Sequence, residues 1–174
     1  MKPTILTRSG SYFDFTDPEN SEICINDIAH ALACICRFTG HTKEFYSVAQ
    51  HSVLMSQIVP DEFALAALLH DAHEAYVGDV SSPLKQLIPD YKELEKKIES
   101  AVLSRFGLPA SMPDVIKHYD MVMLKTELRD VMHCDDHHEI LEGVPYALLK
   151  ISPWHWSLAK VEFIHRFRQL QVKS

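Results

Sequence analysis

Apolar residues recur at intervals of three and four along most of the chain, the spacing that places them on one face of an α-helix. The pattern begins at Ile25, Ile28 and Leu32 and predicts a first helix from residue 25 to about 37–40. Asn26 or Asp27 would cap it. Similar spacing predicts further helices over residues 47–58, 61–77, 90–107, 113–133 and 152–170.

Proline, glycine and capping residues place the ends of these predicted helices. Pro60 stops the second helix, Gly78 ends the third, and Asp90 caps the fourth. Ser152 and Pro153 occupy the cap and the first turn at the start of the last helix, positions that both residue types favour. Each helix therefore has a local reason to begin or end where the periodicity does.

Outside the helices the pattern changes. Residues 1–24 contain the alternating stretch SYFDF and predict a short strand or hairpin, whereas residues 79–89 and 134–151 indicate loops, the former with a short turn. We expect an all-α single domain of about six helices: an extended segment 1–24, a helical core 25–133, and a loop with a C-terminal helix over 134–174.

Composition narrows the function classes. With 47% apolar and 24% charged residues, the chain has the profile of a globular protein. A formal net charge of −7 argues against binding to nucleic acid polymers, which requires a basic surface. The short apolar runs indicate neither a membrane span nor the core of a signal peptide. Four cysteines without CxxC spacing read as reduced thiols, so we expect a cytoplasmic protein without a membrane partner.

Candidate metal ligands gather where the third predicted helix ends. His70 and Glu74 are four residues apart, so they would share one face of a helix, and Asp71 follows His70 directly. Imidazole and carboxylate together suit a divalent transition metal such as Mn, Fe, Co, Ni or Zn. Two or three ligands on one segment do not complete a coordination shell, so other segments must contribute.

Two polar residues lie on faces that are otherwise apolar. His51 falls on the core side of the second helix, and Asp120 shares a stripe with Ile116 on the fifth. A buried carboxylate without a partner is strongly unfavourable. A metal ion shared with His51, His70 and Asp71 would compensate Asp120. The dense segment HCDDHHE (133–139) lacks apolar support, and an exposed loop is the better interpretation there than a second metal site.

These residues resemble the signature of the HD-domain phosphohydrolases, which have an isolated histidine, a later His-Asp pair and a distant aspartate. The chain is similar over about residues 10–130 to bacterial HD-type 5′-deoxynucleotidases. It is also similar to short phage and prophage HD hydrolases, some of which remove triphosphate from dATP. The segments that carry the resemblance are CRFTGH (36–41), AQHS (49–52), HDAHEAYVGDVSSPLK (70–85) and DMVMLKTE (120–127).

The resemblance implies an HD-domain helical bundle whose metal ligands are His51, His70, Asp71 and Asp120. It implies a deoxynucleotide as substrate and a homo-oligomer, a dimer or higher. The activity that it favours is release of phosphate from deoxynucleoside 5′-monophosphates by attack of metal-bound hydroxide. A phage-type triphosphohydrolase that releases triphosphate from dATP or another dNTP is the main alternative, and hydrolysis of cyclic nucleotides or alarmones is a more distant one.

The resemblance also implies roles for five neighbouring residues. Glu74 would position or deprotonate the attacking water, and Asp79 would take part in proton transfer to the leaving oxygen. Arg37 would bind the phosphate or sugar, with Lys85 assisting at the phosphate. Phe38 follows Arg37 where the monophosphatases typically have tryptophan, whose bulk helps to exclude a 2′-hydroxyl.

Two readings without catalysis remain. The chain could be a helical module that senses a nucleotide or a metal, or a structural protein whose histidines are core residues. All four ligand positions and both acidic helpers are intact, and this favours the enzyme.

Overall fold

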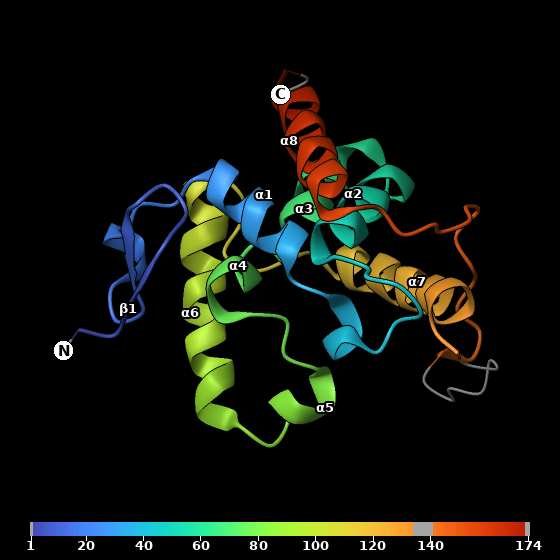
Figure 1. Ribbon diagram of the computed structural model, residues 1–174, viewed down its shortest axis with the longest axis horizontal. Coiled ribbons are helices and arrows are strands. Elements are labelled where there is room, and N and C mark those ends of the chain that lie inside the picture. The colour runs from blue at the N-terminus through green and yellow to red at the C-terminus, as the bar shows by residue number, and fades with distance from the viewer. Residues whose placement is uncertain (1, 134–140, 173–174) are drawn as a thin grey trace.

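The computed structural model describes residues 2–133 and 141–172, in which helices form most of the body and a small hairpin lies at one side (Figure 1). The predicted all-α bundle with a short N-terminal hairpin is confirmed. Among these residues no helix is long and apolar enough to cross a membrane. Apart from His133, which is exposed, the HCDDHHE segment lies outside the described residues.

The hairpin consists of β1 (Thr4–Leu6) and β2 (Tyr12–Asp14), which pair antiparallel with Ile5 opposite Phe13. Phe13 is fully buried, and its ring stacks on that of Tyr76 with the centroids 4.0 Å apart. Aromatic burial of this kind attaches the hairpin to the helical body.

Three helices pack together at the centre. They are α1 (Ile25–Cys34), α2 (Val48–Ile58) and α8 (Trp156–Val172), and each of the three contacts the other two. The Ser47 hydroxyl caps α2 by accepting a hydrogen bond from the Gln50 backbone N–H at 3.2 Å. Helix α1 ends at Cys34, earlier than predicted, and residues 37–40 form the short 3-10 turn η2 (Arg37–Gly40).

The helix predicted over residues 61–77 is interrupted. The chain forms η3 (Asp61–Phe63), α3 (Ala64–Leu69) and α4 (Glu74–Val77). Residues 70–73 make a turn between α3 and α4. His70 and Glu74 therefore do not share a face of one continuous helix, and that prediction is wrong.

His70 itself helps to end α3. Its Nδ1 donates to the carbonyl oxygen of Ala67 at 2.8 Å, an acceptor that a continuing α-helix would use for the N–H of residue 71. Tighter turn bonds follow, one of them from the N–H of Glu74 to the carbonyl of Asp71 at 3.0 Å. Gly78 ends α4 as predicted, with φ of 80° and its N–H bonded to the Glu74 carbonyl at 2.8 Å.

Three further helices lie between α4 and α8 in the chain. They are α5 (Ser82–Lys85), α6 (Pro89–Arg105) and α7 (Asp114–Val131). Helix α5 is the short turn expected within 79–89, and it packs against α6, as does the 3-10 turn η1 (Pro18–Asn20). Asp90 lies in the first turn of α6, where Ile88 is the N-cap residue, so its predicted capping position is wrong.

One predicted helix start and one more predicted cap are wrong. Helix α8 begins at Trp156 instead of near Ser152, and the Gln50 side chain holds the backbone that precedes it. Its amide donates to the Ser152 carbonyl and its oxygen accepts from the Trp154 N–H, both at 2.8 Å. At α1 the N-cap residue is Cys24, so Asn26 and Asp27 lie inside the helix.

Candidate active site

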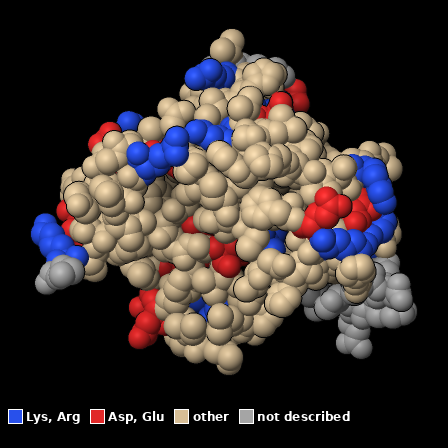
Figure 2. Space-filling view, in the orientation of Figure 1, with Lys and Arg blue, Asp and Glu red and all other residues tan. Residues whose placement is uncertain are grey.

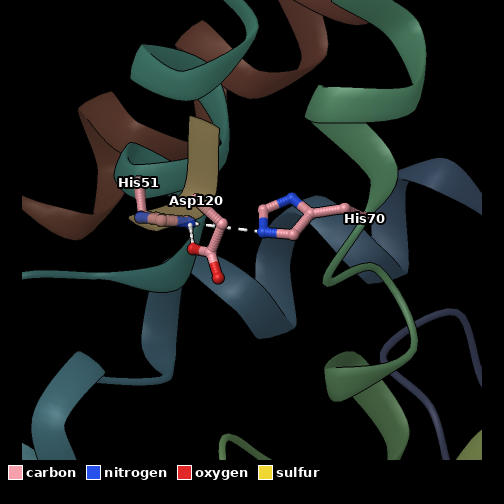
Figure 3. Close-up of side chains that lie close together, drawn as sticks. All are labelled: His51, His70 and Asp120. Carbon is pink, nitrogen blue, oxygen red and sulfur yellow. Dashed lines mark hydrogen bonds and ion pairs between the residues drawn. The ribbon is translucent and has the colours of Figure 1, made fainter. Parts of the chain in front are cut away.

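Side chains from three helical segments converge on one point. His51 comes from α2, His70 follows the last residue of α3, and Asp120 comes from α7 (Figure 3). The two Nε2 atoms are 3.3 Å apart, and His51 Nε2 is 3.4 Å from Asp120 Oδ1. The three possible ligand atoms all lie within 4.8 Å of one another. Residues separated by 69 positions in the chain thus meet in one cluster.

Asp71 completes this cluster. Its Oδ2 lies 3.1 Å from His70 Nε2 and 3.8 Å from His51 Nε2. The four residues predicted as metal ligands are therefore neighbours in the fold, and Asp71 reaches them because residues 70–73 form a turn instead of a helix.

The donor set fits a divalent transition metal. Ligand atoms that share one ion at about 2.1 Å lie roughly 3–3.4 Å apart, which matches the His51–His70, His51–Asp120 and His70–Asp71 separations. The partner of each Nδ1 also fixes the tautomer. His70 Nδ1 donates to a backbone carbonyl, and His51 Nδ1 lies 2.6 Å from a carboxylate oxygen of Glu127. Both Nε2 atoms are thereby directed into the cluster.

Charges within the cluster shift the pKa values of its members. Burial and Arg37 lower the pKa of His51, but Glu127 and Asp120 outweigh them and raise it to about 9. Burial raises the pKa of Asp71, and the nearby His70, His51 and Arg37 hold it below its usual range. A proton on His51 therefore competes with a metal ion for Nε2.

Asp120 differs from its prediction. Its side chain is 40% exposed, so it does not lie buried on the apolar stripe of α7. Burial by neighbouring groups raises its pKa, but the hydrogen bond and charge of His51 lower it overall. The cluster thus opens to solvent on the Asp120 side, where a ligand can enter.

A buried arginine adjoins the carboxylates. The Arg37 side chain is 13% exposed, its Nη2 donates to Glu127 Oε2 at 3.0 Å, and its Nη1 lies 3.7 Å from Asp71 Oδ2. The guanidinium carbon is 5.5 Å from the ring centroid of Phe38. Phe38 has φ of 52°, a left-handed conformation that is uncommon for an aromatic residue. Of the three predicted substrate-binding residues, Arg37 thus lies beside the proposed metal ligand Asp71, and Phe38 lies beside Arg37.

The predicted proton-transfer groups lie on the α4 side. Glu74 is 4% exposed, its Oε2 has no hydrogen-bond partner among the described residues, and its Oε1 lies 3.9 Å from Lys85 Nζ. Burial, together with Asp71 and Asp79, raises its pKa well above the usual value. Burial also raises the pKa of Asp79, against the opposing effect of Arg37. These shifts favour the protonated form of both carboxyls, the form from which a proton can be donated.

Lys85 lies closer to Glu95 than to Glu74. Its Nζ lies 2.5 Å from Glu95 Oε1, and His73 Nε2 lies 3.5 Å from the same oxygen. The ammonium group reaches the site from α5 while Glu95 on α6 holds it. Figure 2 shows carboxylate side chains lining a hollow in the middle of this face, with basic atoms beside them.

Two residues of the site, Glu127 and Glu95, were not predicted from the sequence. Glu127 was part of the DMVMLKTE segment without a role of its own, although it follows Asp120 by seven residues and so lies two turns along the same face of α7. Glu95 had no comparable signal, because a carboxylate on a charged helix such as α6 usually faces solvent.

Comparisons with known proteins give one family match and several relatives. Residues 24–141 match the family described as 5′-deoxynucleotidase YfbR-like. The uncharacterized protein YfdR of Escherichia coli is 46% identical over 171 residues, which cover 95% of this chain and 94% of that protein. An uncharacterized protein of Rhodobacter capsulatus is 43% identical over 119 residues, 63% of this chain and 61% of that protein. A 5′-deoxynucleotidase of Pasteurella multocida is 32% identical over 74 residues, 42% of this chain and 31% of that protein.

Proposed function

Because the chain belongs to the 5′-deoxynucleotidase YfbR-like family of HD-domain proteins, we propose that it hydrolyses the phosphate ester of deoxynucleoside 5′-monophosphates. Family membership confirms the resemblance seen in the sequence segments and supports a hydrolase of the deoxynucleotidase type. The nature of the substrate and the role of each residue are our proposal.

One observation carries the proposal most directly. Two imidazoles and two carboxylates converge within reach of one ion, and a buried arginine lies 3.7 Å from the nearest of these carboxylates. A metal and an arginine side by side are the two groups that bind a phosphate most firmly.

We propose that His51, His70, Asp71 and Asp120 hold a divalent transition metal ion, whose identity their chemistry leaves among Mn, Fe, Co, Ni and Zn. When bound, such an ion lowers the pKa of water and neutralises negative charge on phosphoryl oxygens. The two histidines are suited to this role because each Nδ1 is held by a fixed acceptor.

The remaining residues act on the substrate. Arg37 binds the phosphate through its guanidinium, and Lys85 adds a second positive charge from α5. Phe38, next to the guanidinium, limits the room around the sugar. Glu74 takes a proton from the attacking water, and Asp79 delivers one to the leaving oxygen.

A product assay tests the proposal. Purified protein is incubated with each deoxynucleoside mono- and triphosphate and added manganese, cobalt or zinc, and nucleoside and phosphate products are separated by chromatography. Orthophosphate released from several monophosphates is the expected result. Triphosphate from dATP with the monophosphates untouched would replace the proposal with a triphosphohydrolase. An absence of turnover despite bound metal would favour a sensor.

A further inference from the structure

Glu127 is a buried carboxylate next to the proposed metal ligand His51 and to Arg37. It lies on α7, its side chain is 0% exposed, and it receives donors from three separate segments of the chain. These are Arg37 Nη2 at 3.0 Å, the Tyr46 hydroxyl at 3.0 Å and His51 Nδ1 at 2.6 Å. A buried carboxylate is stable only when it is paired and hydrogen-bonded, and here both oxygens have partners.

The contact with His51 orients a metal ligand. Because Glu127 accepts through Oε1, Nδ1 of His51 carries a proton, and Nε2 points toward His70 and Asp120. A carboxylate bonded to the far nitrogen of a metal-ligating histidine fixes the ring orientation and makes the other nitrogen a stronger ligand. Glu127 is thus placed to strengthen metal binding without touching the ion.

The contact with Arg37 orients a phosphate-binding residue. Oε2 of Glu127 accepts from Nη2, while Nη1 remains near Asp71 and Nε is buried without a hydrogen-bond partner among the described residues. The two residues after Arg37, Phe38 and Thr39, both have φ of 52°. Non-glycine residues hold this left-handed conformation only where surrounding contacts impose it.

We propose that Glu127 is a positioning residue that links the proposed metal ligands to the phosphate-binding arginine. Its Oε1 accepts from His51, and its Oε2 accepts from Arg37. The part concerning phosphate rests on the proposed function, because it assumes that Arg37 binds the substrate phosphate. The part concerning the metal depends only on the converging imidazoles and carboxylates.

Glu127→Gln tests the link. The amide oxygen can still accept from one donor, but the amide nitrogen faces the other donor and cannot accept from it. We expect affinity for cobalt or zinc, measured by competition with a chelator and without substrate, to fall about 10–100-fold. We also expect affinity for inorganic phosphate, measured by calorimetry at saturating metal, to fall, and KM for a deoxynucleoside monophosphate to rise more than kcat falls.

Thr126→Val is the matched control. Thr126 precedes Glu127 on α7, is equally buried, and bonds the Val122 carbonyl and the Ala147 N–H away from the site. It should lower the melting temperature while leaving both affinities within about threefold of wild type. If Glu127→Gln does not fold, Glu127→Asp provides the same measurements. It keeps the charge but is one methylene shorter, so it should weaken at least one of the two affinities.

Three results would overturn the link: Glu127→Gln with unchanged metal affinity, Glu127→Gln with unchanged phosphate affinity, or a control that loses both. Where Glu127→Asp takes the place of Glu127→Gln, the link is overturned if both affinities are unchanged. Failure of the proposed function gives a different pattern. In that case wild-type protein binds metal and phosphate, the Glu127 variant loses both, and no deoxynucleoside monophosphate is hydrolysed.

Discussion

Replacing Glu74 with glutamine should lower the turnover number and raise the free energy of unfolding. Both effects would follow from replacing one carboxyl oxygen with an amide nitrogen. The carboxyl is 4% exposed, and its Oε2 lacks a hydrogen-bond partner among the described residues. Burial and the charges of Asp71 and Asp79 raise its pKa well above the usual value. Ionising such a buried carboxyl is unfavourable, and the resulting rise in pKa is typical of a general base in a buried site.

The size of each effect follows from this environment. Loss of a positioned base typically slows a reaction 10²–10⁴-fold, or about 3–5 kcal/mol in activation free energy. For stability, a carboxyl whose folded-state pKa is raised makes the fold less stable as the pH rises above about 4, where the unfolded chain ionises. Glutamine avoids this loss. We expect a gain of about 1–3 kcal/mol near neutral pH, or roughly 2–4 °C per kcal/mol for a chain of this size.

The assay follows three quantities for Glu74→Gln: kcat at saturating metal, metal content by elemental analysis, and melting temperature of chelator-treated protein between pH 4 and pH 8. Metal content should be unchanged, because the Glu74 carboxylate lies 3.9 Å from Lys85 Nζ and is not among the proposed metal ligands. The gain in melting temperature should vanish toward pH 4.

Glu99→Gln serves as the control. Glu99 is half-buried on α6, and burial raises its pKa as well. It should gain stability in the same pH range while keeping its turnover. If Glu74→Gln keeps kcat within about threefold of wild type, Glu74 is not the base. If it instead lowers the melting temperature, the carboxylate supports the fold and the electrostatic argument fails.

Three further expectations follow from individual contacts. Asp71→Ala should abolish both bound metal, by elemental analysis, and turnover, and activity that survives would refute its role as a ligand. Lys85→Gln should raise KM roughly 10–100-fold through loss of a charged contact, with Glu95→Gln giving a smaller change, since Glu95 only holds the lysine. Asp130→Asn should cost about 2 kcal/mol at neutral pH in urea unfolding. Hydrogen bonds to Asp130, of which that from Arg129 has the largest effect, hold its pKa below the usual value. The stability that Asp130 contributes is therefore present above about pH 4 and is lost as the pH falls through its pKa in the folded protein. A cost that does not shrink in acid would contradict this.

Much of the site could be found from local pattern. His51 is fully buried, as its place on the core side of its helix predicted. Asp120 meets it across the fold, although its carboxylate is more exposed than an apolar stripe suggested. Periodicity identifies polar residues that face inward, because a helix repeats every 3.6 residues whatever lies beyond it. It does not report which two faces will meet.

The turn at residues 70–73 shows the limit of that method. Apolar spacing continued through this stretch, and nothing local marked a break. At the break, His70 Nδ1 donates to the carbonyl of Ala67, and its Nε2 lies close to His51 Nε2 and Asp71 Oδ2. The contact with His51, which lies on another helix, belongs to the tertiary structure and cannot be read from local spacing.

By itself the sequence determined the helical class of this protein, the approximate extents of its main helices and the set of residues able to bind a metal. These follow from side-chain chemistry and short-range spacing. The tertiary structure alone decided that Glu127 serves both His51 and Arg37, and that Glu95 holds Lys85. Such pairings join residues up to 90 positions apart. A carboxylate looks the same in the sequence whether it faces water or a buried cation, so only the packing of helices reveals its partner.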